Sequence, residues 1–367
     1  MTSQEEKEIT HRFPITESEY LNLNPAGDAM GSRIMLLAFF ITSLTTLACT
    51  PPEPKKGKEP VTLQLKWLHQ GQFAGFYMAK EKGYYTAENL DVTFLEGGKD
   101  INPCERLCTG NADFAIVSAE SVFTKHTENS NAKAVAVIYQ RSPVVFAAKT
   151  ESHIVRPRDF AGKTIAVGNV EGGGFAEALV QFNTLMKKTG LTPSDYRTVP
   201  YDPLFKDFLS TKADITPTYL VNGAIQLRTM GITLNLIWPG DYGIPFYSDT
   251  LVTTGAYLRE KPDIALRFFR ASMKGWKDVV EQVDEAVEVT MKYAAGTDRT
   301  FQRNMIEAQM PLVHTGEHPI GWMEPVIWKS MYEILVDQGI ITKPVQDLES
   351  VYTFDLLYAL YGRAGEK

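Results

Sequence analysis

The sequence predicts an α/β protein of two lobes joined by a hinge, with a helical C-terminal segment wrapped around one lobe. Three observations lead to this prediction. The chain has 367 residues, which is too long for one small core and suits two lobes. Short apolar runs alternate with helical patterns, as in parallel α/β sheets. The alternation restarts after "RPRDFAGK", and the chain later returns to the first lobe, which predicts two crossovers.

The first lobe is expected to contain a parallel sheet of short, apolar strands. Helical stretches lie between these strands, and strand, helix, strand at this spacing is typical of parallel pairing. The predicted strands are residues 61–66, 91–95, 113–117 and 134–139, and the predicted helices are residues 72–82 and 118–126.

The second lobe is expected to be a smaller α/β unit. Its predicted strands are residues 164–168, 214–216 and 233–237, and its long helix covers residues 175–189. These segments continue the alternation of the first lobe. The second lobe is therefore predicted to cover residues 149–248.

After Trp238 the chain is expected to return to the first lobe. The run "LVTTGAYL" (251–258) is predicted as the returning strand, and Pro262 then opens a helix at its first turn, where a missing N–H costs nothing. This helix has one apolar face and begins a mostly helical C-terminal segment. The first lobe is therefore predicted to comprise residues 61–148 and 249–367. The apolar face contains Ala265, Phe268, Phe269, Ser272, Trp276, Val279 and Val280.

Residues 30–48 have the pattern of a secretory signal peptide. One basic residue, Arg33, precedes an apolar run that is too short to span a ~30 Å hydrocarbon layer, and a small residue ends the segment. We therefore predict that translation starts at Met30 and that residues 1–29 come from an upstream start.

The residue that follows the signal peptide is Cys49. A small residue immediately before a cysteine resembles the bacterial lipobox, in which the cysteine becomes lipidated. Residues 49–60 are rich in proline and lysine and carry no core-forming residues, as in a tether. The prediction is an extracytoplasmic protein anchored to the membrane by a lipid on Cys49.

Charge and cysteine content exclude several classes of function. The net charge is −7, with scattered lysines and arginines, so nucleic acid is not an expected partner. Cys104 and Cys108 lack neighbouring ligands and are interpreted as small buried hydrophobes, with a strained local disulfide left open. "HTGEH" (314–318) has zinc-peptidase spacing, but Gly316 and the following proline argue against the helix that such a site needs. We expect no metal, no cofactor and no catalytic group.

Two segments point to a binding site. In "GNVEGGGFAE" (168–177), glycines let backbone N–H groups approach a bound group at a helix start; a tight turn without a ligand is an equal alternative. Glu177 could accept hydrogen bonds from a ligand amine, and a solvated carboxylate in the first turn of the helix is again an equal alternative. In "WPGDYGIPFYSDT" (238–250), aromatic residues gather in a loop where the chain crosses back, which favours a cleft over a cap on the core. The candidate residues are Gly172, Gly173, Gly174, Glu177 and Tyr242.

Several ordered motifs resemble one family. They are "LKWLHQGQFAGFYMAKEKGYYTAENLDVTFLEGG", "GNADFAIVSAESVF", "AVAVIYQRSPVVFAA", "DFAGKTIAVG" and "PGDYGIPFYSDTLVTT". Together, from about Val61 to Tyr352, they are similar to the periplasmic solute-binding proteins related to the thiamine-pyrimidine synthase. The resemblance implies a type II periplasmic-binding-protein fold that closes on a solute and delivers it to the permease and ATPase subunits of an ABC importer.

The resemblance also implies where the solute binds. Side chains at strand ends, where α/β sheets gather ligands, would line the cleft between the lobes. Trp67 would stack on a flat ring, whereas Phe76 and Tyr77 would pack beneath the sheet. Amide and hydroxyl groups would match the ring's donors and acceptors. The candidates are Trp67, Gln70, Phe73, Ser118, Tyr139, Gln140, Ser142, Tyr219 and Asn222.

The family leaves the solute open. Members bind thiamine pyrimidine precursors, which we expect first; relatives bind riboflavin, the alternative, or small sulfonates such as taurine, which rank third. Eukaryotic relatives are pyridoxal-phosphate-dependent synthases, with a lysine at the end of the third strand and cysteines near the return crossover. This chain has Ser118 at that strand end and no cysteine in "DYGIPFYSDT", so the synthase alternative is disfavoured and a non-enzymatic binder is expected.

Overall fold

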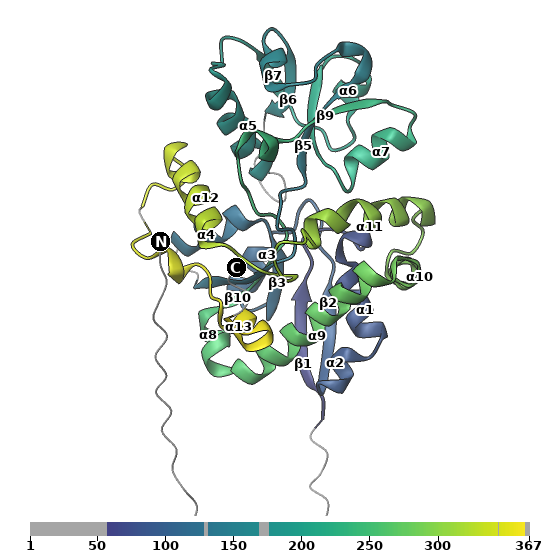
Figure 1. The fold of residues 1–367 in the computed structure, drawn as a ribbon, viewed down its shortest axis with the longest axis vertical. Coiled ribbons are helices and arrows are strands. Elements are labelled where there is room, and N and C mark those ends of the chain that lie inside the picture. Colours follow the sequence, from purple (N-terminus) through teal and green to yellow (C-terminus); the bar gives the residue numbers. More distant parts are fainter. Residues whose placement is uncertain (1–56, 128–130, 169–175, 344, 364–367) are drawn as a thin grey trace, which may run out of the picture. The chain divides into compact units, whose positions relative to one another are not determined.

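The described strands form two five-stranded sheets. The computed structural model describes residues 57–127, 131–168, 176–343 and 345–363, all within the unit that comprises residues 56–367. Figure 1 shows one sheet in the part that contains β1 and a second sheet beside α5, α6 and α7. We call these parts the first and second lobe. The predictions for residues 1–29 and 30–48, Cys49 and Gly172–Gly174 lie outside the described residues.

The first sheet is mixed, although the sequence predicted parallel strands. β1 pairs in parallel with β2 and β3, whereas β10 runs antiparallel between β3 and β4. The difference has a simple cause: β10 enters from the second lobe, at the edge where β3 and β4 end, and so runs in the opposite direction. The order is β2 (Leu90–Leu95), β1 (Glu59–Gln64), β3 (Phe114–Val117), β10 (Thr250–Thr254) and β4 (Ala132–Val137).

The second sheet is also mixed. β6 pairs in parallel with β7 and β8, while β5 is antiparallel to β8 and β9. The sequence analysis did not identify β5 or β7, and the predicted lobe boundary at residue 149 falls at the end of β5. The order is β7 (Arg197–Pro200), β6 (Thr164–Gly168), β8 (Ile215–Tyr219), β5 (Val144–Lys149) and β9 (Leu234–Ile237).

Helices flank both sheets. In the second lobe these are η2 (Thr150–Ser152), η3 (Pro157–Phe160), α5 (Ala176–Thr189), α6 (Lys206–Leu209), α7 (Gly223–Thr229) and η4 (Pro239–Tyr242). The first lobe contains η1 (Gly71–Phe73), α1 (Ala74–Glu81), α2 (Tyr84–Ala87), α3 (Pro103–Cys108), α4 (Ala119–Thr127), α8 (Gly255–Glu260), α9 (Pro262–Glu281), α10 (Val283–Tyr293), α11 (Arg299–Val313), α12 (Pro325–Asp337), η5 (Leu348–Ser350) and α13 (Asp355–Tyr361).

The C-terminal helical segment forms as expected. Pro262 is the first residue of α9, and Val280 is the only member of the predicted apolar face that is not fully buried among these described residues. One correction concerns "LVTTGAYL": β10 ends at Thr254, whose side chain caps α8 by accepting a hydrogen bond from the Tyr257 N–H. A threonine that bonds the backbone ahead of it starts a helix and so ends the strand.

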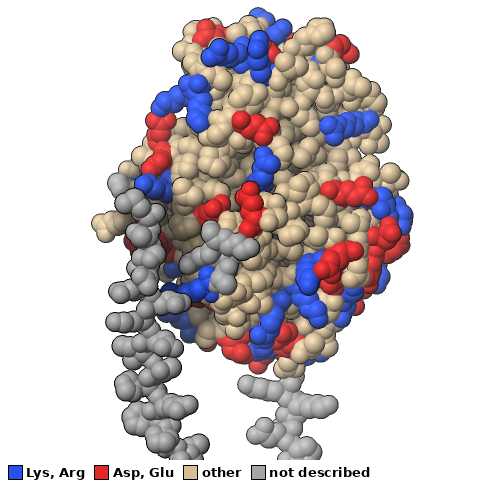
Figure 2. Space-filling model, in the orientation of Figure 1, with Lys and Arg blue, Asp and Glu red and all other residues tan. Residues whose placement is uncertain are grey.

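The surface carries charges of both signs. On the face that Figure 2 shows, lysine and arginine side chains lie among aspartates and glutamates. Several make ion pairs across α10 and α11, such as Arg303 with Asp284. In the described part of the chain, no helix has the length and apolar character that a membrane crossing requires.

Candidate functional site

The two crossover segments lie against one another where the lobes meet. The backbone N–H groups of Ile138 and Tyr139 donate to the carbonyl of Asp249, at 2.8 and 3.4 Å. The first crossover follows β4, and the second precedes β10, so both start or end at the same edge of the first sheet. Side chains on these segments can therefore face both lobes.

A buried polar cluster centred on Lys66 connects the lobes. Lys66 follows β1, and its Nζ lies 2.8 Å from Glu177 Oε1 and 2.5 Å from Tyr219 OH, both in the second lobe. The same ammonium lies 3.5 Å from Asp249 Oδ1 on the second crossover. Ser118 Oγ, after β3, donates to Glu177 Oε1 at 2.9 Å. The ends of two strands of the first lobe thus meet the start of α5.

Amide side chains extend the cluster. Gln72 Nε2 donates to Asp249 Oδ2 at 2.6 Å, and Gln70 Nε2 donates to Gln72 Oε1 at 2.5 Å. Asn222 Nδ2, at the start of α7, donates to Gln70 Oε1 at 3.3 Å. This chain of bonds runs from the second lobe through the η1 loop to the crossover. We call Lys66, Gln70, Gln72, Ser118, Glu120, Glu177, Tyr219, Asn222, Ser248 and Asp249 the interlobe cluster.

The local backbone explains how these groups come together. Gly71 lies between the two glutamines, and its N–H donates to Gln302 Oε1 on α11 at 2.6 Å. A Cβ on Gly71 would lie 2.9 Å from Ile306 Cγ1, so a side chain there would push the loop away from α11. The glycine allows the loop to lie flat on α11 and directs both glutamines toward the crossover.

The charges of the interlobe cluster are strongly coupled. Burial alone lowers the pKa of Lys66, but the neighbouring acidic groups, above all Glu177, outweigh burial and hold that pKa well above its usual value. Burial raises the pKa of Asp249. Burial, reinforced by the charge of Glu177, raises the pKa of Glu120 to about 8. Lys66 is therefore protonated at neutral pH, while Glu120 keeps its proton.

The interlobe cluster and its surroundings contain acceptors that lack donors. Among the residues that the structure describes, Glu177 Oε2 and Gln181 Oε1 are buried acceptors with no hydrogen-bond partner. Asp249 Oδ1 has only the Lys66 ammonium, at 3.5 Å, and the buried carboxyl of Glu120, which keeps its proton, has no partner at Oε2. A buried polar atom without a partner is costly, about 1–3 kcal/mol each. These incompletely bonded groups suggest that a bound molecule supplies hydrogen-bonding groups, chiefly N–H or O–H donors.

The structure brings together part of the predicted site. Gln70, Ser118, Glu177, Tyr219 and Asn222 are members of the interlobe cluster. Three others lie at the first crossover: Ser142 Oγ accepts a hydrogen bond from Gln181 Nε2, Tyr139 OH donates to Gln309 Oε1, and Gln140 bonds Thr315 and Pro319.

Other predicted residues are packed against the core or exposed on the surface. Trp67 is half-buried against the core, and Phe73 is fully buried in it. Tyr242 is 38 % exposed in η4, on the surface of the second lobe. Phe76 and Tyr77 are fully buried, as predicted. Tyr77 stacks on Tyr293, with ring centroids 4.2 Å apart, so much of the aromatic opening stretch builds the core.

Sequence reasoning missed half of the interlobe cluster. Lys66 immediately precedes Trp67, so the same strand-end rule that selected the tryptophan applied to the lysine. Glu120 lies two residues beyond Ser118, and Asp249 lies on the loop that was singled out only for its aromatics. The missed residues are Lys66, Gln72, Glu120, Ser248 and Asp249.

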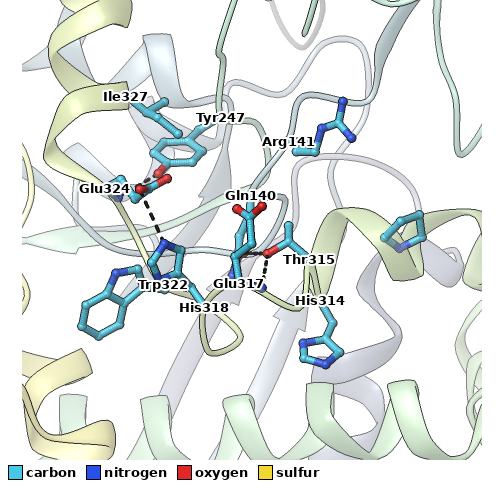
Figure 3. Close-up of a pocket in the computed structure, with 11 residues that line it drawn as sticks. Gln140, Arg141, Tyr247, His314, Thr315, Glu317, His318, Trp322, Glu324 and Ile327 are labelled. Atoms are coloured by element: carbon cyan, nitrogen blue, oxygen red, sulfur yellow. Dashed lines mark hydrogen bonds and ion pairs between the residues drawn. The ribbon is translucent and has the colours of Figure 1, made fainter. Parts of the chain in front are cut away.

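A separate pocket of about 390 Å³ lies at the crossovers (Figure 3). The second crossover contributes Tyr247 to this pocket, whereas Ser248 and Asp249 belong to the interlobe cluster. "HTGEH" forms part of the pocket wall. As expected, it is not helical: α11 ends at Val313, and Gly316 has a φ of +84°.

Neither the pocket nor the cysteines form a metal site. Among the described residues, no group of three or more histidine, cysteine, aspartate or glutamate side chains is arranged to hold a metal ion. Cys104 is buried and Cys108 half-buried, and no disulfide joins them. The local disulfide that the sequence left open is not present.

We expect Glu120 to make the empty protein less stable as pH rises from about 5 to about 8. Its usual pKa is 4.5 and its folded-state pKa about 8, so in this window the folded state holds a proton that the unfolded state releases. Asp249 acts in the same direction, and His69, whose pKa burial lowers, acts in the opposite one.

Urea unfolding of the wild type and E120Q at pH 5, 6.5 and 8 isolates the effect of Glu120. The contributions of His69 and Asp249 are common to both proteins. Glutamine stays neutral, so the profile of E120Q should fall less steeply over this range. Parallel profiles would mean that Glu120 ionises in the folded protein as it does in the unfolded chain.

Comparison with known proteins identifies the family of this chain. The family model described as NMT1/THI5 like matches residues 70–286. The riboflavin-binding protein RibY of Chloroflexus aurantiacus is 25 % identical over 88 % of this chain and 97 % of its own length. A formylaminopyrimidine-binding protein of Halalkalibacterium halodurans is 26 % identical over 77 % of this chain and 81 % of its own length.

An enzyme also occurs among the relatives. The 4-amino-5-hydroxymethyl-2-methylpyrimidine phosphate synthase of Legionella pneumophila is 21 % identical over 63 % of this chain and 73 % of its own length. The two relatives that match this chain over the greater length are binding proteins.

Solved structures establish the fold. The periplasmic aliphatic sulphonate binding protein SsuA from Escherichia coli superposes with a TM-score of 0.65 at 12 % identity, over 80 % of this chain and 91 % of its own. The predicted type II periplasmic-binding-protein fold is thus confirmed. Because the family model covers more than half of the chain, this protein belongs to the NMT1/THI5-like family of ABC-importer solute-binding proteins.

Proposed function

We propose that the interlobe cluster binds a flat, uncharged heteroaromatic solute that is rich in hydrogen-bond donors, and that the protein delivers this solute to an ABC importer. The observation that carries the proposal is the set of incompletely bonded buried oxygens, above all Glu177 Oε2 and Gln181 Oε1, which have no hydrogen-bond partner among the described residues. Ring N–H, amino and hydroxyl groups of a solute would satisfy them. Flavins and aminopyrimidines both offer such donors on a flat ring.

The charge of the cluster favours this class over sulfonates. Lys66 is its one described cation, and it is already paired with Glu177 and close to Asp249. A taurine or alkanesulfonate group would bring only acceptor oxygens and a negative charge to a site with surplus acids. Buried like charges repel strongly because the local dielectric constant is low. A sulfonate is therefore the poorer match.

Of the two heteroaromatic classes, we rank the flavin first. The sequence pointed to a thiamine pyrimidine before riboflavin, but the riboflavin-binding relative aligns over 97 % of its length and the formylaminopyrimidine-binding one over 81 %. The hydroxyl groups of a ribityl chain would also supply several donors to the unpaired oxygens. A pyrimidine precursor remains the second candidate.

A synthase reaction is not part of the proposal. The strand end where synthases carry a Schiff-base lysine holds Ser118, whose hydroxyl is bonded to Glu177. Lys66 lies nearby, but its raised pKa keeps it protonated, and a protonated amine is not a nucleophile.

We also propose that the protein works outside the cytoplasm, held at the membrane by a lipid on Cys49. Mass spectrometry of the membrane-extracted protein tests this proposal, because the lipid adds mass to the N-terminal peptide.

A thermal-shift panel tests the solute class. We expect riboflavin at one hundred times its dissociation constant to add about 2.7 kcal/mol to the stability and to raise the midpoint by a few degrees. The same panel should contain hydroxymethylpyrimidine, formylaminopyrimidine, pyridoxal phosphate and taurine. A flavin fluorescence titration measures the riboflavin affinity independently of the thermal shift.

Each outcome of the panel is informative. A thermal shift with an aminopyrimidine alone would support the interlobe cluster as the binding site but would rank the pyrimidine precursor above the flavin. A shift with taurine alone would contradict the role given to the unpaired acceptors. Pyridoxal phosphate that binds and gives a Schiff-base absorption band would overturn the binding-protein proposal.

A further inference from the structure

The pocket at the crossovers is chemically distinct from the interlobe cluster. Its walls come from the two crossovers, the end of α11, the segment between α11 and α12, and the start of α12. No residue of the interlobe cluster lines it. Figure 3 shows Tyr247 and Glu324 together near the start of α12, with His314 toward the end of α11. The lining residues are Gln140, Arg141, Tyr247, Pro311, His314, Thr315, Glu317, His318, Trp322, Glu324 and Ile327.

Several polar groups of this pocket are already used. Gln140 Nε2 donates a hydrogen bond to the Pro319 carbonyl, at 2.8 Å, and Gln140 Oε1 accepts one from Thr315 Oγ1, at 2.9 Å. Arg141 lies 3.3 Å from Asp241 Oδ1, and its guanidinium stands 4.2 Å above the Trp238 ring. The positive charge of the arginine is therefore balanced by groups outside the pocket.

The groups that remain are acceptors beside flat rings. His318 stacks on Trp322, with centroids 6.2 Å apart and planes at 19°. Its Nε2 lies 3.5 Å from Glu324 Oε1, and a proton on Nε2 makes Nδ1 an acceptor. Nδ1 is buried and has no hydrogen-bond partner in the part of the chain that the structure describes. The carboxylates of Glu317 and Glu324 add negative charge.

From this arrangement we infer a second binding site, in which the pocket takes a small aromatic cation such as an amidinium or a protonated aminopyridine. The ring lies against His318 and Tyr247, and the charged N–H groups donate to Glu324, Glu317 and His318 Nδ1. A flat cation meets both the aromatic walls and the surplus acceptors. A carboxylate of the same shape would be repelled by Glu317 and Glu324, and the Arg141 guanidinium is already paired with Asp241.

Benzamidine, benzamide and benzoate are matched probes for this site, because they share a shape and differ in charge. The protein has five tryptophans, so we would label it with 5-fluorotryptophan and follow the fluorine NMR spectrum of the full chain. W322F identifies the Trp322 resonance. We expect benzamidine to shift that resonance, with Trp67 and Trp276 unmoved and benzoate without effect.

The double variant E317Q/E324Q tests the role of the carboxylates. Both side chains are partly or fully exposed, so the fold should be retained, and benzamidine affinity should fall about fivefold, as expected for the loss of half-exposed ion pairs. K187M, which removes an exposed lysine that belongs to neither site, should leave benzamidine binding unchanged. Equal shifts with all three probes, unchanged affinity in the double variant, or a shift confined to Trp67 would overturn the inference.

Discussion

K66M is expected to lower the free energy of unfolding at pH 8 by about 3–5 kcal/mol, the usual cost of removing one partner from a buried ion pair. Lys66 contacts Glu177, Tyr219 and Asp249 from a side chain that is 5 % exposed. Methionine has a similar volume but no charge. The variant would leave Glu177 and Asp249 as buried acids without a cation.

The same substitution is expected to weaken solute binding by more than a hundredfold. The ammonium fixes Glu177 and Tyr219 of the second lobe to the strand end of the first, so its loss changes the position of the acceptors that we assign to the solute. Denaturant unfolding gives the stability and flavin fluorescence titration gives the affinity. The loss of stability should be smaller at pH 5, because the stranded acids can then take up protons.

Two further variants separate stability from binding. K66M/E177M removes both charges, and replacing a whole buried pair by apolar residues is often neutral; this protein should recover much of its stability but not its affinity. K187M removes an exposed lysine that pairs with Asp337 and should cost less than about 1 kcal/mol. A stable K66M that binds solute with wild-type affinity would show that the interlobe cluster is not the site.

The interlobe cluster shows which parts of a site can be predicted from sequence. Strand ends locate a cleft in an α/β protein, and this rule found Ser118, Tyr219 and the segment around Gln70. The rule also selected Trp67 because aromatic residues are visible in a sequence. It passed over Lys66, the residue immediately before Trp67, since a lone lysine normally lies in solvent. Only the long-range contacts with Glu177 and Asp249 make that lysine a buried one.

The fold was easier to predict than the site, and the errors in the predicted strands have a common cause. Buried strands such as β3 and the apolar face of α9 depend on local patterns, and both formed as expected. Strand direction depends on which edge of the sheet the chain enters. β10 returns from the second lobe and is therefore antiparallel, which no local pattern records. β10 ends early, at Thr254, because this residue caps α8. In the sequence a capping threonine cannot be told from an ordinary strand threonine.

G275A is expected to destabilise the protein by about 1–3 kcal/mol, the typical cost of overpacking. Gly275 lies on α9 where this helix crosses α1. A Cβ at this position would lie 2.1 Å from the Gly75 carbonyl oxygen and 2.7 Å from the Ala79 nitrogen. Both obstacles are backbone atoms, so no side chain can rotate away, and the two helices must separate to admit a methyl group.

The sign of this effect is a strict test, because helix propensity acts the other way. Within a helix, alanine is favoured over glycine by about 1 kcal/mol, so G275A should stabilise α9 if the contact with α1 were loose. G255A is the matched control: Gly255 begins α8, and the nearest atom to its added Cβ is Arg259 Nη1 at 3.4 Å. Urea unfolding should show G255A near neutral or slightly stabilised. If G275A were also stabilised, α1 and α9 could not lie as close together as described. This close packing supports the η1 loop and its two glutamines.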